Sequence, residues 1–133
     1  MNKLVILCSV ILMLSACNGK EDIETYGYGC LQEARAALSR GDFSRARQSI
    51  DSLRTHYPKA FNAREEGILV LDSVDLFEAQ KQLLETNARL KQLGLSRIAR
   101  DTLQFRYDEA AQKIKFFSRK LQHDIVNKKI YKE

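Results

Sequence analysis

Apolar residues recur every three or four positions from about residue 26 to residue 127, with polar residues between them. That spacing places apolar side chains along one face of an α-helix, whereas a half-buried strand alternates apolar and polar residues. No stretch of the chain alternates convincingly over the length of a strand. The pattern therefore predicts an all-α fold, which glycine and proline residues divide into helical segments.

Two short helices are expected first, over residues 26–40 and 44–57. Gly41 follows the first helix as a C-cap, because glycine readily adopts the left-handed conformation that ends a helix. Pro58 ends the second helix or opens the next one. The apolar faces of the two helices comprise Leu31, Ala34, Ala37 and Leu38, and Ala46, Ile50, Leu53 and Tyr57.

Residues 26–58 resemble one tetratricopeptide-type helix-turn-helix unit. The matching residues are Gly41, Phe43, Ala46, Ile50, Leu53 and Pro58. The resemblance implies a tight helical hairpin in which Phe43 fills the gap between helices that approach closely at Ala46. The first helix lacks the large aromatic anchor of that family, and no second copy is evident, so an extended array is not expected. The candidate partner groove of this unit is lined by Phe43, Leu53 and Tyr57.

Two long helices are expected next, and they should form an antiparallel, coiled-coil-like hairpin over residues 59–127. The first reaches Leu93 before Gly94 interrupts it, and Ser96 is the expected N-cap of the second. Residues 128–133 form a basic tail. The expected seam comprises Leu69, Leu76, Ala79, Leu83, Leu90 and Leu93, facing Leu103, Tyr107, Ala110, Ile114, Phe117 and Leu121. Alternatively, part of this seam stays open for a helix of another protein, with Ser73, Gln80 and Asn87 weakening its closure.

The amino terminus has a different pattern. Asn2 and Lys3 precede an eleven-residue run from Leu4 to Leu14 that is almost purely apolar. A bilayer span needs about 20 apolar residues, so this run has the length of a signal-peptide core instead. Small residues follow it, as a signal peptidase requires. The sequence at this point is Leu14, Ser15, Ala16 and Cys17.

This sequence resembles the lipobox of bacterial lipoproteins. The resemblance implies that residues 1–16 are a signal peptide, which is removed by cleavage before Cys17. Cys17 then becomes the first residue and carries the lipid that anchors the protein to a membrane. Residues 17–25 then form the lipidated cysteine and a flexible tether. In such lipoproteins, an Asp directly after the lipidated cysteine is associated with retention in the inner membrane. Position 18 is Asn, and the absence of Asp favours the outer membrane. Lys20, Glu21 and Asp22 are similar to a surface-sorting signal, with an ordinary polar linker as the alternative.

Charge and composition narrow the candidate functions. A chain of 133 residues with one Pro and six Gly suits one small helical domain. Residues 97–133 contain ten Lys and Arg against five Asp and Glu, whereas residues 18–96 are nearly neutral. A basic segment attracts nucleic acid, anionic lipid or an acidic protein, but an exported protein rarely meets nucleic acid. The alternative is a solvated helix surface rich in lysine.

No catalytic or cofactor-binding motif is evident in the sequence. The two histidines, His56 and His123, form no zinc or di-iron motif, and no phosphate-binding loop occurs. Cys30 would be left unpaired, either buried or in an intermolecular disulfide. No enzyme activity, metal or cofactor is therefore expected.

The sequence predicts a lipid-anchored envelope protein that acts as a non-enzymatic interaction or scaffold module, distantly similar to outer-membrane assembly lipoproteins. The alternative is a structural spacer between membrane and cell wall or surface. The partner is expected to be an envelope protein, and the long helices allow a homo-oligomer.

Overall fold

The computed structural model describes the backbone of residues 19–130 and the side chains of residues 22–128. The described chain forms four helices and contains no strand. They are α2 (Gly19–Ser39), α3 (Phe43–His56), α4 (Phe61–Leu90) and α5 (Arg97–Ile130). The all-α prediction is confirmed.

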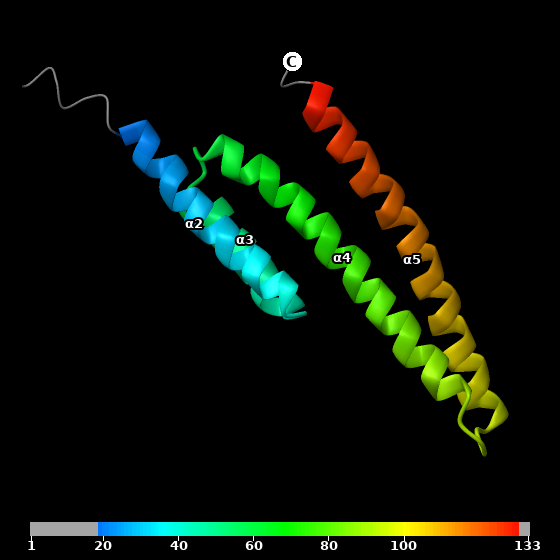
Figure 1. The fold of residues 1–133 in the computed structure, drawn as a ribbon. Helices are drawn as coiled ribbons and strands as arrows, with labels where there is room; N and C mark the ends of the chain where they lie inside the picture. Colours follow the sequence, from blue (N-terminus) through cyan, green and yellow to red (C-terminus); the bar gives the residue numbers. More distant parts are fainter. Residues whose placement is uncertain (1–18, 131–133) are drawn as a thin grey trace, which may run out of the picture.

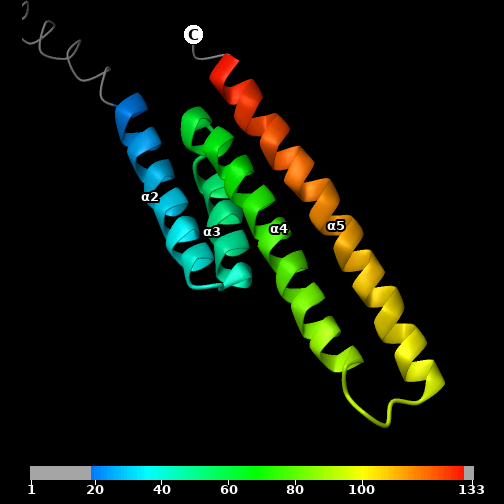
Figure 2. The ribbon, with the colours of Figure 1, turned by 45° about the vertical axis from the view of Figure 1, so that its right-hand side comes forward.

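Helix α4 lies at the centre of the arrangement (Figure 1). The short helices α2 and α3 pair with each other and both pack on α4, whereas α5 runs antiparallel to α4 along its other side. The α2–α3 pair covers only the N-terminal part of α4. The distal part of the long hairpin, toward the α4–α5 connection, extends beyond the α2–α3 turn as two helices alone (Figure 2).

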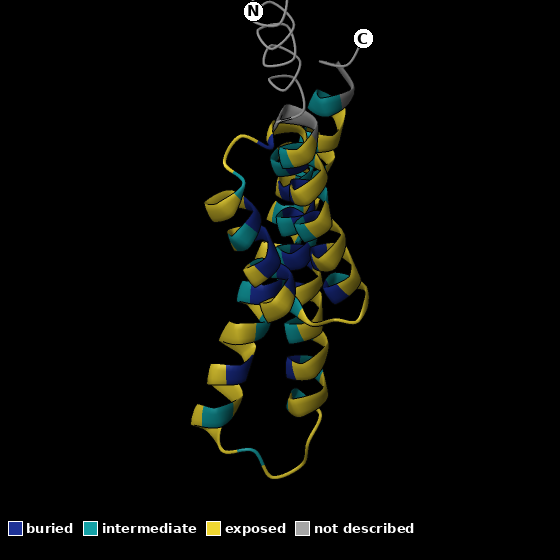
Figure 3. Ribbon diagram, turned by 90° about the vertical axis from the view of Figure 1, so that its left-hand side faces the viewer, coloured by how far each residue is buried: buried dark blue, intermediate teal, exposed yellow. Residues whose placement is uncertain are grey.

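The core lies where α2, α3 and α4 meet. Leu31, Ile50, Leu53 and Val74 are its largest fully buried side chains. Small residues complete it and allow the helices to approach closely: Ala34, Ala37, Ala46, Ala60 and Ala63. Buried residues thin out toward the tip of the long hairpin (Figure 3).

The turn between α2 and α3 follows the expected design. Gly41 has a φ of 72°, and the N–H groups of Gly41 and Asp42 donate to the carbonyls of Leu38 and Ala37. This is the Schellman pattern, in which a left-handed glycine ends a helix, so the predicted C-cap is confirmed. The Asp42 carboxylate then accepts the N–H of Arg45 at 3.0 Å and caps α3.

The start of α2 is a correction. The helix begins at Gly19, so residues 19–25 are helical and are not the expected tether. Ile23 packs against the core. The Glu24 carboxylate accepts the N–H groups of Asn62 at 3.1 Å and Ala63 at 3.3 Å, at the first turn of α4. The N-cap residue of α4 offers no side-chain hydrogen bond, so Glu24 satisfies these donors instead.

The long hairpin agrees with its prediction in outline. Gly94 has a φ of 81° in the connection, and the Ser96 hydroxyl accepts the N–H of Ala99 at 3.2 Å as an N-cap. Two details differ. Leu93 is 100% exposed in the loop and takes no part in the seam. Helix α5 continues to Ile130, so the first residues of the expected basic tail are helical.

The polar residues of the α4–α5 seam also differ from expectation. Gln80 is exposed, and the half-buried Ser73 donates its hydroxyl to the carbonyl of Leu69 within its own helix. The buried polar residues in this part of α4 are Asp72 and Thr86.

Gly27 lies at the closest approach of α2 to α4. A Cβ atom at this position would be 2.5 Å from the Cβ of Ala60 and 3.2 Å from that of Ala63. These Cβ atoms are bonded directly to the backbone, so they cannot move away unless the backbone moves with them. Gly29 is two residues further along α2 and points in a different direction, where a Cβ atom would have open space around it.

We expect Gly27→Ala to lower the free energy of unfolding by about 1–3 kcal/mol, because overpacking forces α2 away from α4. The matched control Gly29→Ala should raise it by up to about 1 kcal/mol, since alanine is the better helix former. Urea unfolding followed by circular dichroism measures both. Equal effects of the two substitutions would show that the close approach at Gly27 is not a constraint.

Candidate interaction surfaces

The groove expected from the sequence does not form. Leu53 is completely buried in the core and offers nothing to a partner. Phe43 and Tyr57 are half-buried at opposite ends of α3, a helix of 14 residues, and so lie about 20 Å apart. Tyr57 instead stacks on Tyr26 of α2, with ring centroids 5.9 Å apart.

A different hollow, which we call the central cleft, lies where α3, α4 and α5 meet. Its volume is about 620 Å³. Phe43 and Phe117 supply its aromatic walls. Its remaining lining residues are Arg47, Asp75, Glu78, Ala79, Lys81, Gln82, Glu85 and Lys113.

Most charges of the central cleft are already paired. Arg47 donates to Asp75 at 2.6 Å and to Glu78. Burial opposes the charged form of Arg47, but these two hydrogen bonds outweigh it and raise its pKa. The Lys81 ammonium lies 5.9 Å from the centroid of the Phe43 ring, a cation–π contact. The cleft therefore offers aromatic walls between neutralised charges, without a pair of groups arranged for acid–base chemistry.

A charged cluster joins α4 to α5. Asp72 is only 4% exposed, and Lys120 of α5 donates to it at 2.5 Å and to Asp124 at 3.0 Å. Burial raises the pKa of Asp72, partly offset by Lys120. Hydrogen bonds from His123 and Lys120 lower the pKa of Asp124 to about 2. One oxygen of Asp72 has no partner, so the Lys120 ammonium is the main compensation for this buried charge.

A second cluster joins α2, α4 and α5 around Glu66. Its carboxylate accepts hydrogen bonds from Arg35 at 2.7 Å and Tyr28 at 3.4 Å, and forms an ion pair with Lys128 at 3.1 Å. Burial opposes ionisation of Glu66, but the two cations outweigh it and lower its pKa. Lys128 is therefore engaged within the fold, although the sequence assigned it to a free basic tail.

The remaining chemistry-bearing residues form no reactive site. Burial, followed by the nearby charge of Glu33, raises the pKa of the half-buried Cys30 thiol, which disfavours the nucleophilic thiolate. His56 is exposed at the end of α3. Among the described residues, no three His, Cys, Asp or Glu side chains gather as a metal site would require.

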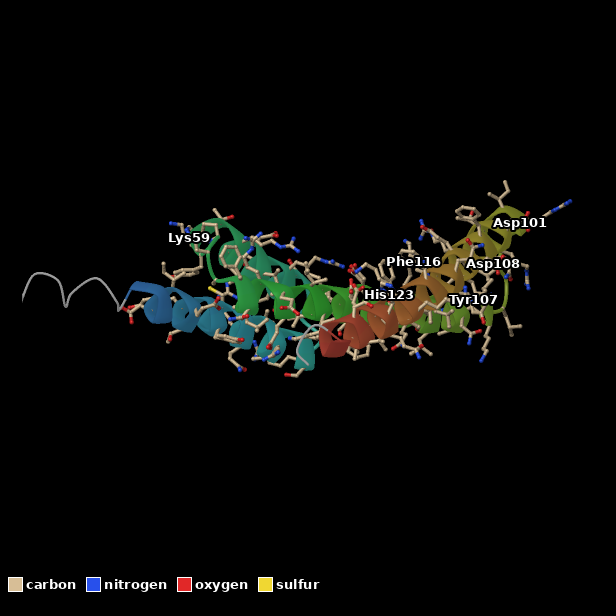
Figure 4. The ribbon with its side chains drawn as sticks, turned by 90° about the horizontal axis from the view of Figure 1, so that it is seen from above. Lys59, Asp101, Tyr107, Asp108, Phe116 and His123 are labelled. Atoms are coloured by element: carbon tan, nitrogen blue, oxygen red, sulfur yellow. The ribbon has the colours of Figure 1, made fainter. Side chains whose placement is uncertain are left out.

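Large apolar side chains are exposed mainly on the long hairpin, and the sequence interpretation missed their significance. Phe77 and Leu84 lie on α4, Leu93 in the loop, and Ile98, Phe105 and Phe116 on α5. Figure 4 shows Phe116 on the opposite side of α5 from Tyr107, which belongs to the seam with α4. The seven-residue spacing of Ile98 and Phe105, outside the seam, was the available signal.

The lipobox-like residues Leu14, Ser15, Ala16 and Cys17 lie outside the described residues. Lys20, Glu21 and Asp22 fall within the first turns of α2, and Asp22 is exposed. Within residues 19–130, every helix is too short or too polar to cross a bilayer.

Comparison with known proteins gives no relative: no family model, curated protein or solved structure matches the chain. The tetratricopeptide resemblance therefore stays a prediction, and the structure supports only the broader description of paired helices.

The Asp72 cluster provides a test of what fixes α5 on α4. Breaking a fully buried ion pair costs about 3–5 kcal/mol of folding stability. Because the Lys120 side chain is 37% exposed, we expect Lys120→Met to lower the free energy of unfolding by less, roughly 1–3 kcal/mol. Adding Asp72→Asn should recover much of this loss, because no buried charge then remains. Chemical denaturation of the single and double variants measures the coupling.

Lys113→Met is the control, since Lys113 pairs with Glu109 on the exposed surface of the same helix. Its effect should stay within about 0.5 kcal/mol. Equal losses for Lys120→Met and Lys113→Met would contradict a special role of the buried carboxylate.

Proposed function

We propose that the protein is a lipid-anchored protein of the bacterial envelope that acts as a non-enzymatic interaction or scaffold module. The anchor rests on the N-terminal sequence, in which the short apolar run ends at Leu14 and the lipobox-like residues follow. Lipid on Cys17, including palmitate on its new amino group, would hold the chain to the membrane, because several acyl chains make anchoring effectively permanent.

The observation that carries the interaction role is the exposure of apolar side chains on the distal part of the hairpin. There the two helices lack a third layer, and Leu84 and Phe105 are 66% and 71% exposed. Apolar surface left uncovered in this way marks sites where other proteins bind. A partner helix laid against this part would bury it.

The arrangement of the helices also suits an anchored scaffold. Helix α2 begins two residues after Cys17, so the lipid would hold the helical body close to the bilayer surface. The start of α2 and the end of α5 lie at the same end of the molecule, and the tip around Leu93 lies at the other (Figure 1). With 30 residues in α4, the tip would stand about 45 Å from the anchored end.

This length also favours the second candidate, a spacer that holds the membrane apart from the cell wall or another layer. The proposed location is the outer membrane, since Asn18 is not the Asp associated with inner-membrane retention. Lys20, Glu21 and Asp22 would act in sorting from the first turns of α2. Nucleic acid is not a proposed partner.

The anchor is tested by labelling cells with radioactive palmitate. We expect label on the wild-type chain and on Cys30→Ser, which keeps Cys17, and no label on Cys17→Ala. Absence of label from the wild type, or equal labelling of Cys17→Ala, would overturn the anchor.

The interaction role is tested by photocrosslinking in cells. A photoreactive amino acid at Leu84 should give one dominant protein adduct by mass spectrometry, because this exposed apolar residue lies where a third layer is absent. The same group at Thr55, exposed on α3, is the matched control. A diffuse set of neighbours at Leu84, similar to that at Thr55, would favour the spacer instead.

A further inference from the structure

The outer face of α5, turned away from α4, has no helix of the described chain packed on it (Figure 2). Nevertheless it carries Ile98, Phe105 and Phe116, which are 79%, 71% and 60% exposed. Residues of a helix are about 100° apart, so these three side chains fall within about 20° of one another around the axis. They form an apolar strip along the helix, which Glu109 and Gln112 interrupt between Phe105 and Phe116.

A charged strip runs beside this apolar strip. After Arg97 in the first turn of α5, its acidic and basic residues are segregated along the helix. Asp101 and Asp108 lie in the N-terminal half of α5, whereas Lys115 and Arg119 lie in the C-terminal half. By the same helical spacing, all four project to the same side of the apolar strip. A helix with this pattern is complementary to an antiparallel copy of itself.

We propose that α5 pairs with α5 of a second copy of this chain, antiparallel and about a two-fold axis near Ala111. In this register Phe105 packs against Phe116 of the partner subunit, and the reverse contact follows from the symmetry. Asp101 comes within reach of the partner's Arg119, and Asp108 within reach of the partner's Lys115. The apolar strips and the charged strips then meet side by side.

The charged groups are available for these contacts. Among the described residues, no acidic group lies within ion-pair distance of Lys115 or Arg119. Asp101 has only the distant contact to Arg97, at 4.0 Å between two well-exposed side chains. Asp108 accepts one hydrogen bond, from Gln104. The two-fold pairing supplies each with an opposite charge.

A second copy fits this face better than a lipid surface does. After Arg97, the charged strip has two acids and two bases, so an anionic bilayer would be repelled at Asp101 and Asp108 while attracted at Lys115 and Arg119. On a uniformly charged surface, the attraction of the two bases is offset by the repulsion of the two acids. An antiparallel copy instead places an opposite charge beside each of the four groups. The dimer rests on the proposed interaction role but not on the lipid anchor, and it leaves Leu84 free for another partner.

Charge reversal tests the pairing in the full chain, solubilised in mild detergent at low salt. Asp101→Lys and Arg119→Glu should each weaken the dimer about tenfold or more, because each places like charges together twice across the axis. The double variant should restore the dimer to within about threefold of the wild type. Sedimentation equilibrium measures the dissociation constants, and circular dichroism checks that every variant stays helical.

Cysteine crosslinking tests the face itself. In a Cys30→Ser background, Gln112→Cys lies on the outer face near the axis and should give a covalent dimer with a short thiol crosslinker. Lys113→Cys is one residue away and lines the central cleft, so it should give little dimer. Both variants are compared in cells.

A monomeric wild type, failure of the double variant to restore the dimer, or equal crosslinking at Lys113 would overturn the proposal. A wild-type chain that stays monomeric but binds vesicles of anionic lipid, and loses that binding in Arg119→Glu, would assign the face to the membrane instead. Palmitate on Cys17 and the adduct at Leu84 are measured separately, so the failure of the dimer is distinguishable from failure of the proposed function.

Discussion

Helix α4 has to pack on two opposite sides at once, and the rest of the fold depends on how it does so. On one side α2 approaches so closely that only glycine fits at position 27, opposite Ala60 and Ala63. On the other side α5 is held through a narrow seam and through the Lys120 contact to buried Asp72. Small residues therefore set one interface of α4, and a buried charge sets the position of the other.

The two interfaces differ in how much they bury, and this divides the molecule. Near the α2–α3 pair, α4 is enclosed by three helices and includes the largest buried side chains of the core. Toward the tip it has a single neighbour, and the seam leucines Leu83 and Leu90 are only half-buried. Stability is concentrated at the end that carries the start of α2, whereas large apolar side chains are exposed toward the other end. This division fits the scaffold role that we propose, in which the well-packed α2–α3–α4 end supports the less buried tip of the α4–α5 hairpin.

The helices themselves could be predicted from the sequence because their signals are local. The spacing of leucine and alanine, the glycine at 41 and the serine at 96 each act within a few residues. The helical conformation of residues 19–25 could not be predicted, since Gly19 and the charged residues after it favour a linker by propensity. Contacts with residues almost 40 positions later override that propensity.

The interaction surfaces were harder to predict than the helices. Periodicity identified Leu53 as part of an apolar face, but whether such a face meets the core or solvent depends on which neighbour covers it. The same ambiguity hid the exposure of Phe105 and Phe116, which lie on the face of α5 opposite the seam. The partners of Asp72 and Glu66 come from helices distant in sequence, so no local pattern indicated them.

The hydrogen bonds from the start of α4 to Glu24 have a consequence for the order of folding. Glu24 and Asn62 are 38 residues apart, so during synthesis, or during the export that we propose, Glu24 emerges well before its partner. Until α4 follows, the glycine-containing start of α2 has little to hold it helical. In the export that we propose, residues 19–24 would therefore stay unfolded close to the proposed processing site until α4 had followed them.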